Sequence, residues 1–480
     1  MRRARPASRC ATRGGSAVNS AALALYHALP PSLRSVAASL RGIQLRYWRY
    51  GSDTERWVEE ALERDHWSGA KWAAYQEEQL GRVLERAATK VPYYREHWEA
   101  RRRRGDRAAW DDLANWPVLE KSAIREAPRA FVADDRSLRR MFPEHTSGTT
   151  GTPLQLWWSR ETVQRWYALF EARTRRWYGV SRRNCWAILG GQLVVPPSAS
   201  RPPYWVWNAG LNQLYLSAYH IQGRTADEYL RALQDYKVRY LLGYPSALTS
   251  LAHAASPGAC RDAGLTVVVG NAEPLTSVQR ATIQEAFGCP VRDTYGMAEI
   301  VAAASECAAG TMHLWPEVGW IEQSVSTAPD LVCTGLLNVD MPLVRYRVGD
   351  QGRVAPPGDS CACGRGLPRL IELHGRADDM LYAMDGRPIG RLDPVFKAAL
   401  CITEAQIIQD AFDRVRVRYV PATGHTEVHA KAVVEGIRAR MGPVSVELEQ
   451  VAVIPRGANG KFRAVICTLP PDAIRSQARS

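Results

Sequence analysis

The sequence predicts an α/β protein of at least two domains, and three observations support this fold class. The chain has 480 residues, which is more than one hydrophobic core of ordinary size accommodates. Strand-like apolar runs alternate with helical periods along most of the chain. Roughly the last hundred residues instead carry alternating strand patterns around short helices. We therefore expect a large N-terminal α/β domain followed by a small α+β C-terminal domain.

The N-terminal stretch differs from the rest because the first acidic residue is Asp53. Arg, Ser and Ala are abundant before it, and we interpret residues 1–28 as a disordered tail or a targeting segment. The apolar run from Ala21 to Leu29 is interrupted by Tyr26 and His27 and falls far short of the roughly 20 residues that a membrane span needs. Ten cysteines are too few for a disulfide scaffold. These features predict a soluble, cytoplasmic protein without a membrane span.

Elements of the first half follow from apolar spacing. The region Gln79–Trp98 has a helical period that Pro92 should end. The run Leu154–Trp158 is typical of a strand, and a helical period follows it, with apolar residues at Val163, Trp166, Tyr167 and Phe170.

In the second half, Val267–Val269 predicts a strand that ends in a turn over Gly270–Pro274. Thr276 and Gln279 then form a capping-box pattern that opens a helix to Phe287. Near the C-terminus, alternation predicts strands around Val417 and Val446, with a short helix over Val433–Met441 between them.

The run Thr146–Pro153 is dense in hydroxyls and glycines, a composition suited to wrapping a polyphosphate. No Walker motif is present, because no Gly-Lys-Ser/Thr follows and the next residues predict a strand rather than a helix. We expect a loop between strands that binds phosphate. The alternative is an ordinary solvated loop of Ser, Thr and Gly.

The net charge is +13, yet the basic residues are scattered and no nucleic-acid-binding motif is present. We therefore predict no nucleic-acid partner and favour an anionic substrate such as ATP or coenzyme A. Nearly all the positive charge is arginine. Each of the few lysines is therefore a candidate for a role that needs a compact charge.

Six segments in order carry a resemblance to a known family: Thr146–Pro153, Gly270–Pro274, Asp293–Glu299, Tyr346–Asp350, Gly375–Asp379 and Pro455–Lys461. Over roughly residues 30–470 the chain resembles the adenylate-forming (acyl-CoA synthetase-like) enzymes, in their phenylacetate-CoA ligase and CapK-like capsule-biosynthesis branch. The resemblance implies a large AMP-binding domain over residues 29–375. It also implies a small mobile domain over residues 376–480 that carries the catalytic lysine.

The resemblance implies a role for each matching residue in binding ATP. The β and γ phosphates would be held by Thr146, Ser147, Gly148, Thr149, Thr150 and Gly151. Groups around the adenine would come from Gly270, Asn271, Ala272, Glu273, Thr294, Tyr295 and Gly296, with the ring of Tyr295 stacked on the base. Asp350 would accept from the ribose hydroxyls, and Arg376 would donate to ribose or phosphate. The alternative for Tyr295 is a buried core tyrosine. The alternative for Asp350 or Arg376 is half of a surface ion pair.

Chemistry is assigned by the same resemblance to Glu299 and Lys461. Glu299 would bind Mg²⁺, which prefers carboxylate and phosphate oxygens. Lys461 would place its ammonium between the carboxylate and the α-phosphate during attack. Asp378 or Asp379 would be the hinge of the small domain. The alternative for Glu299 is an exposed acid at a helix start, and the alternative for Lys461 is a solvated loop lysine.

The chain departs from the wider superfamily at Leu154, where many relatives carry a lysine. The phenylacetate-type branch commonly lacks that lysine, so the departure agrees with the branch.

Cys307, His313, Cys361 and Cys363 supply three thiolates and one imidazole, the ligand set of a closed structural zinc site. The spacing matches no standard zinc finger, so free buried thiols are the alternative. Some relatives hold a metal at matching positions, which favours zinc.

Aromatic residues are concentrated between Pro202 and Tyr219 and, with Gly243–Ser246, resemble the acyl-pocket region of the branch. They indicate an aromatic or other flat acid, or else core packing. His220 is either a polar group of that pocket or a structural histidine.

Three functions follow from these observations. The first is ATP-dependent activation of a carboxylic acid as an acyl-adenylate, with release of pyrophosphate and transfer to coenzyme A. The second is adenylation followed by transfer to an amine, a sugar or a carrier protein, and the third is nucleotide binding without catalysis. The retained Glu299, Asp350 and Lys461 argue against the third. The oligomeric state, monomer or homodimer, is left open.

Overall fold

The computed structural model describes residues 23–146, 154–196, 199–221, 223–322, 330–356, 360–376, 381–384, 388–389, 402–421, 426, 431, 433–435, 437–438, 441–455, 463, 465–470, 473–474 and 477. Side chains are described for these residues except at 374–376, 388–389 and 403.

Residues 23–28 are helical, and ten further α-helices follow in the described chain. They are α2 (Pro31–Arg49), α3 (Thr54–Arg64), α4 (Gly69–Lys90), α5 (Pro92–Arg103), α6 (Lys121–Glu126), α7 (Arg160–Phe170), α8 (Gly223–Asp235), α9 (Pro245–Ala254), α10 (Ala259–Asp262) and α11 (Ser277–Phe287). Short 3₁₀ turns are η1 (Leu113–Asn115), η2 (Pro128–Phe131), η3 (Leu138–Arg140), η5 (Arg176–Tyr178) and η6 (Ala209–Leu211). The turn η4 (Glu171–Arg175) is π-helical.

Strands of the large domain are β1 (Phe142–His145), β2 (Gln155–Trp158), β3 (Trp186–Gly190), β4 (Trp205–Asn208), β5 (Gln213–Ser217), β6 (Tyr240–Gly243), β7 (Val267–Gly270), β8 (Val291–Gly296), β9 (Ala303–Glu306), β10 (Met312–Leu314), β11 (Gly319–Ile321), β12 (Asp330–Gly335), β13 (Tyr346–Val354) and β14 (Arg369–Arg376). Strands nearer the C-terminus are β15 (Leu381–Tyr382), β16 (Pro388–Ile389), β17 (Ile402–Ala411), β18 (Arg414–Pro421), β19 (Ser445–Gln450) and β20 (Val465–Cys467).

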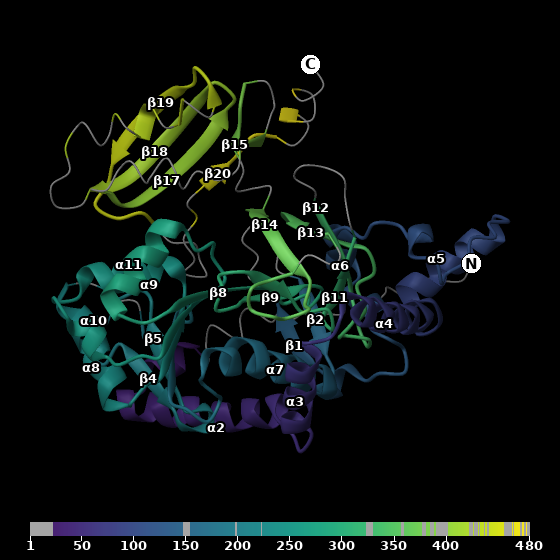
Figure 1. Ribbon diagram of the computed structural model, residues 1–480, viewed down its shortest axis with the longest axis horizontal. Helices are drawn as coiled ribbons and strands as arrows, with labels where there is room; N and C mark the ends of the chain where they lie inside the picture. Colours follow the sequence, from purple (N-terminus) through teal and green to yellow (C-terminus); the bar gives the residue numbers. More distant parts are fainter. Residues whose placement is uncertain are drawn as a thin grey trace, which may run out of the picture.

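One sheet of 12 strands forms the centre of the large domain, in the order β11-β12-β13-β14-β10-β9-β8-β7-β6-β3-β5-β4. Strands β5, β3, β6, β7 and β8 run parallel to one another. Along the rest of the sheet order, β8-β9-β10-β14-β13-β12-β11, every neighbouring pair is antiparallel. Helices α8, α9 and α11 lie together over the parallel half (Figure 1). Strands β6 and β7 are buried along their whole length, as expected for parallel strands covered on both faces.

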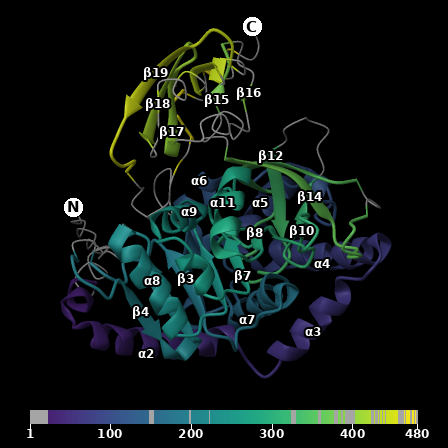
Figure 2. The same cartoon turned by 60° about the vertical axis from the view of Figure 1, so that its left-hand side comes forward.

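A separate sheet of four strands, β19-β18-β17-β20, lies apart from the large sheet in both views (Figures 1 and 2). Residues 433–435, 437–438 and 441 are helical beside it, and Val433, Ile437 and Met441 pack on Val415 and Val417. The predicted fold class, α/β with a small α+β unit, is therefore confirmed. The proposed domain boundary at residue 376 falls at the end of β14, and residues 377–380 lie outside the described part of the chain.

Local signals in the sequence correspond to these elements. Helix α4 ends at Lys90, and Pro92 begins α5, where a proline without an amide hydrogen is tolerated. Thr276 and Gln279 form the predicted capping box at the start of α11. Residues 23–28, expected to belong to the tail, are helical, and the Tyr26 hydroxyl donates to the Val194 carbonyl at 3.1 Å. Residues 1–22 lie outside the described chain.

Candidate adenylation site

The carboxyl ends of three neighbouring parallel strands meet at one edge of the sheet, where β6, β7 and β8 end at Gly243, Gly270 and Gly296. The carbonyl of Gly270 accepts from the Thr294 hydroxyl at 2.8 Å, and the Asn271 amide donates to the Gly243 carbonyl at 3.0 Å. These bonds join the three strand ends. Crevices at the carboxyl edge of an open α/β sheet are the usual place for a ligand in such folds.

The turn Gly270–Pro274 follows β7 and has a constrained backbone. Ala272 adopts a left-handed conformation with φ of 62°, which is uncommon for a residue with a Cβ and is often found at binding sites. Glu273 accepts from the Ser246 amide at 3.1 Å, which connects the turn to the start of α9. The side-chain oxygen of Asn271 is buried and has no hydrogen-bond partner among the described residues. An unpaired buried acceptor fits a ligand that donates, such as the amino group of adenine.

Tyr295 and Asp350 meet across the sheet. The Tyr295 hydroxyl on β8 donates to a carboxylate oxygen of Asp350 on β13 at 2.8 Å. In a flat sheet these strands would be about 19 Å apart, because β9, β10 and β14 lie between them and neighbouring strands are about 4.8 Å apart. The antiparallel half must therefore curl over, and this curl brings the two motifs together. Burial and the negative charge of Asp350 both raise the pKa of Tyr295, so the phenol stays protonated.

Glu299 lies in the turn after β8 and is only 8% exposed. One of its oxygens accepts from the hydroxyl of buried Tyr346 at 2.9 Å. Glu299 is thus neither exposed nor at a helix start, contrary to the alternative interpretation. A buried carboxylate with an oxygen still able to accept is a suitable ligand for a hard cation such as Mg²⁺.

The phosphate-loop segment connects two antiparallel strands, β1 and β2, as predicted. Thr146 closes the base of this connection, because its hydroxyl accepts from the Leu154 amide at 2.9 Å and its own amide donates to the Leu154 carbonyl. Ser147, Gly148, Thr149, Thr150 and Gly151 lie outside the described residues, as do Lys461, Asp378 and Asp379. Arg376 lies opposite Asp350 in the pairing of β13 with β14, although its side chain is not among those described.

Two residues near these motifs were not assigned by sequence reasoning. Tyr346 belongs to a recognised segment, but nothing in the sequence indicated that its hydroxyl reaches Glu299. Lys121, at the start of α6, places its ammonium 6.0 Å from the centre of the Tyr346 ring. The scarcity of lysine was the one sequence signal that could have pointed to it.

The four predicted metal ligands lie together, with their ligand atoms all within 4.8 Å of one another. The sulfurs of Cys307 and Cys361 are 3.8 Å apart, and the Cys363 sulfur is 3.3 Å from Nε2 of His313. Tetrahedral zinc with Zn–S of about 2.3 Å and Zn–N of about 2.0 Å places such atoms roughly 3.5–3.8 Å apart, so the cluster fits a zinc ion.

Residues around the cluster favour metal binding by His313. Nδ1 of His313 donates to the Leu367 carbonyl at 3.2 Å, which leaves Nε2 as the free ligand atom. Burial lowers the pKa of His313 and so favours the neutral imidazole that binds metal. Gly310 and Gly364 adopt left-handed conformations that turn the chain after Cys307 and Cys361.

A cavity of about 560 Å³ lies beside this cluster rather than at the strand edge. Its lining is mainly apolar and includes Trp72, Trp320, Val354 and Cys361. None of the residues predicted to bind ATP lines it, so we assign it no part in the nucleotide site.

Tyrosines surround the carboxyl end of β3. The Tyr219 hydroxyl donates to the Gly191 carbonyl at 2.9 Å, and a Cβ on Gly190 would meet the Tyr215 hydroxyl. Tyr244 follows β6 at the same edge and is half-buried. His220 stacks on Tyr204, and both its ring nitrogens have hydrogen-bond partners, Ser217 and the Pro196 carbonyl. These contacts agree with the structural alternative for His220.

Comparisons with known proteins agree with these motifs. Residues 381–468 match the CapK C-terminal domain family. The chain is 26% identical to Protein CapK of Staphylococcus aureus over 237 residues, which are 49% of this chain and about half, 52%, of that relative. It is 27% identical to a phenylacetate-coenzyme A ligase of Aromatoleum evansii over 333 residues, 64% of this chain and 71% of the relative. These matches support the predicted resemblance to the adenylate-forming superfamily.

The relatives that match by sequence are CapK and phenylacetate-coenzyme A ligases. The fold is also that of a solved 2-hydroxyisobutyryl-CoA ligase bound to its acyl-adenylate, with a TM-score of 0.62 at 22% identity, covering 87% of this chain and 93% of that one. At that identity the likeness concerns the fold.

Proposed function

We propose that this protein is an ATP-dependent, AMP-forming carboxylate ligase. The observation that carries the proposal is the convergence of the Tyr295–Asp350 pair and the Glu299–Tyr346 pair from distant segments of one sheet. Both pairs lie in the segments that resemble the nucleotide-binding motifs of the superfamily. In a protein that only bound nucleotide, a buried carboxylate such as Glu299 would have no reacting phosphate to serve.

In the proposed first step, a carboxylate oxygen of the substrate attacks the α-phosphorus of ATP. The bond from that phosphorus to the bridging oxygen of the β-phosphate breaks, and pyrophosphate leaves. Asp350 accepts from the ribose hydroxyls while Tyr295 fixes its carboxylate. Asn271 offers its unpaired oxygen to the adenine amino group. Lys461 supplies positive charge where the two anions meet.

Mg²⁺ would be held by Glu299 together with phosphate oxygens, and when bound it neutralises charge that accumulates on the phosphates. Tyr346 orients the Glu299 carboxylate for this task. Thr146 and the loop after it would receive the β and γ phosphates.

The Cys307, His313, Cys361 and Cys363 cluster is proposed to bind a structural zinc ion. All four tetrahedral positions would be filled by protein ligands, which leaves none for substrate. We therefore assign the zinc no step in the reaction.

The acyl group is proposed to lie near Tyr215, Tyr219 and Tyr244, at the edge formed by β3 and β6. Burial raises the pKa of each phenol, so this wall is neutral and aromatic. Such a wall suits an aromatic or other flat carboxylic acid.

In the second step, a thiolate of coenzyme A would attack the acyl carbon, and AMP would leave. A second candidate acceptor is an amine, a sugar or a carrier protein, and the match of residues 381–468 to the CapK C-terminal domain favours keeping it. The resemblance implies that the small domain rotates after adenylation and then forms the side of the site that the acceptor enters.

The acceptor is tested by following one turnover. The protein is loaded with an acid that supports pyrophosphate release, and AMP release is then measured with and without coenzyme A. Fast AMP release only with coenzyme A, together with a thioester product, is the expected result. Adenylate that forms but is not discharged by coenzyme A would contradict the thioester step and favour the second acceptor class.

A further inference from the structure

Helix α2 presents an apolar stripe to solvent. Leu33, Val36, Leu40, Ile43 and Tyr47 recur at spacings of three and four residues, and each side chain is between 49% and 64% exposed. This spacing places all five on one face of the helix. Arg160 contacts one end of the stripe, where its guanidinium lies 3.7 Å from the centre of the Tyr47 ring.

The opposite face of α2 is fixed to the large domain. The Ser35 hydroxyl accepts from the Trp207 amide at 3.2 Å, and the Ser39 hydroxyl accepts from the Ala209 amide at 3.0 Å. A Cβ on Gly210 would clash with the backbone of Gly42 and Ile43, so the two backbone segments touch directly. Helix α2 is therefore a rigid part of the surface, and its stripe stays outside because the other face is already buried.

Helix α2 also carries exposed arginines. Arg41 follows Leu40 and lies about 100° around the helix from it. Arg46 lies on the side of Ser39, seven residues earlier, beside the face that contacts the large domain. Both are exposed. The sequence contains no Asp or Glu before Asp53, so the described residues 23–52 carry only positive formal charge.

This charge pattern selects among the possible occupants. Pairing with α2 of a second copy would set arginines against arginines, without the opposite charges that usually flank a helix–helix seam. A helix that is apolar on one face and carries exposed arginines is suited to lying in the plane of an anionic bilayer. No described helix is long and apolar enough to cross a membrane, so the contact would be at the surface.

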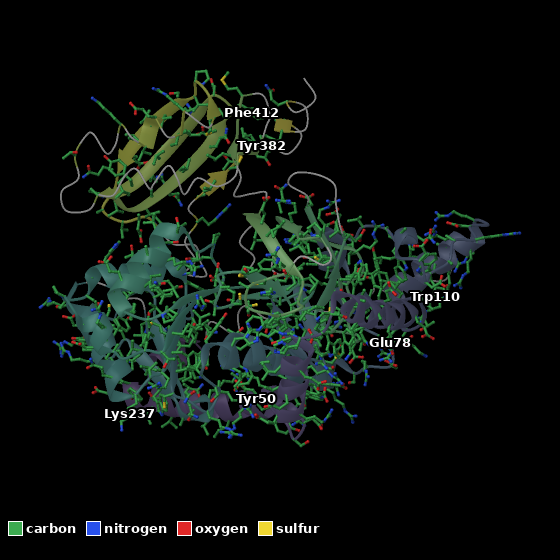
Figure 3. All side chains as sticks on the ribbon, viewed as in Figure 1. Tyr50, Glu78, Trp110, Lys237, Tyr382 and Phe412 are labelled. Atoms are coloured by element: carbon green, nitrogen blue, oxygen red, sulfur yellow. The ribbon has the colours of Figure 1, made fainter. Side chains whose placement is uncertain are left out.

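We propose that the outer face of α2 is a docking surface for an anionic lipid membrane. Leu33, Val36, Leu40, Ile43 and Tyr47 would enter the boundary between headgroups and acyl chains, and Arg41 and Arg46 would meet lipid phosphates. Both views place α2 on the side of the large domain away from the small sheet of β17–β20 (Figures 1 and 2). Tyr50, just after α2, lies at that same lower side (Figure 3).

Docking through α2 leaves the other side of the molecule in the aqueous phase. Ser250 on α9 donates to Glu404 on β17 at 3.3 Å, which marks the side on which the large domain meets the small sheet. A membrane-bound molecule would thus keep that side open to soluble substrates. The inference rests on the surface of α2 and does not depend on the proposed ligase activity.

Vesicle flotation of the full-length protein tests this proposal. We expect binding to vesicles of phosphatidylcholine with phosphatidylglycerol, much weaker binding to phosphatidylcholine alone, and loss of binding at high salt. The double variant Leu40→Glu/Ile43→Glu should bind at least about tenfold more weakly, because two charges would enter the apolar boundary. Arg41→Gln/Arg46→Gln should weaken binding and reduce its dependence on salt.

The matched control is Leu448→Glu, which changes an exposed leucine on β19 of the small sheet and should bind like the unchanged protein. Circular dichroism and the thermal midpoint establish that each variant is folded. Equal flotation of the unchanged protein and the Leu40→Glu/Ile43→Glu variant would overturn the proposal, as would absence of flotation. A dimer in light scattering that this variant converts to monomer would also overturn it, in favour of a second copy on the stripe.

Discussion

Two tyrosine–carboxylate contacts each hold one acid of the proposed site in place. Tyr295 fixes Asp350, and Tyr346 fixes Glu299. Neither tyrosine needs to react. Each uses a hydroxyl to orient a charged acceptor that the nucleotide or its metal would meet, so the loss of one hydroxyl should harm activity without unfolding the protein.

Tyr346→Phe should lower kcat/KM for adenylation by about tenfold to a hundredfold, since a hydrogen bond to a charged group is worth about 1.5–3 kcal/mol. The loss should be larger at low Mg²⁺ and partly restored by excess Mg²⁺, because Glu299 would be less well oriented as a ligand. Steady-state pyrophosphate release at varied Mg²⁺ measures this. Tyr47→Phe, which loses a hydrogen bond from Arg160 on the exposed face of α2, is the control. Equal activity of the two variants would contradict the assigned role of Tyr346.

Asp293 on β8 should make the stability of the protein depend on pH. Burial, together with the nearby Glu306, raises the pKa of Asp293 from 3.8 to about 7. The folded protein therefore keeps a proton on this acid that the unfolded chain has released, and the free energy of unfolding falls as the pH rises through that window. Asp293→Asn keeps an oxygen for the Thr294 amide but has no proton to lose.

Urea unfolding of both proteins at a series of pH values tests this. The advantage of Asp293→Asn should be absent near pH 4 and should grow up to about pH 7. Stability curves that run parallel across this range would show that Asp293 does not carry the effect.

At the scale of elements, local sequence signals were sufficient for single helices and strands. Pro92, the Thr276–Gln279 capping box and the apolar run Val267–Val269 each lie where the structure starts or ends an element. Contacts between distant segments were not predictable in this way. The curl that joins Tyr295 to Asp350 depends on the pairing order β8-β9-β10-β14-β13, which no local pattern encodes.

The Cys/His cluster lies within this curl. Cys307 follows β9, His313 is on β10, and Cys361 and Cys363 precede β14, which pairs with both β10 and β13. A metal there would connect the strands between Tyr295 and Asp350. The sequence identifies the four residues as metal-ligand types. Only the fold shows that their ligand atoms lie close together.

Cys361→Ser/Cys363→Ser should remove zinc from the purified protein and weaken ATP binding, because the curl would lose its cross-link. Zinc content by mass spectrometry and ATP affinity by calorimetry measure the two effects. Cys260→Ser, at a buried cysteine outside the cluster, should keep the zinc. Stoichiometric zinc in the Cys361→Ser/Cys363→Ser variant would place the metal elsewhere.

At the scale of the whole molecule, the sequence predicted two unlike units, and the structure contains a sheet of 12 strands and a separate sheet of four. The large unit also has a buried ionic connection that patterning could not reveal. Arg173 is fully buried in η4 and bonds to Asp65, after α3, at 2.8 Å and to Glu317, before β11, at 2.7 Å. Apolar periodicity identifies core positions, so a buried arginine goes unnoticed until its partners are known.

Arg173→Ala should lower the free energy of unfolding by about 3–5 kcal/mol, because it removes the fully buried cation that Asp65 and Glu317 share. Among the described residues, the Trp177 indole would still donate to Asp65 at hydrogen-bond distance, and Arg64 to Glu317. Arg56→Ala, which removes exposed pairs with Asp53 and Glu60, should change it little. Urea unfolding compares the two. Similar small losses for both variants would show that the buried cluster does not hold these elements together.

We propose that the two units act together on ATP and a carboxylate. The most direct measurement is ATP–pyrophosphate exchange across a panel of carboxylic acids, with the unchanged protein, Lys461→Ala and Lys431→Ala. We predict exchange with at least one acid, retained by Lys431→Ala and abolished in Lys461→Ala, while Lys461→Ala still binds ATP. Absence of exchange with every acid, or full exchange in Lys461→Ala, would contradict the account.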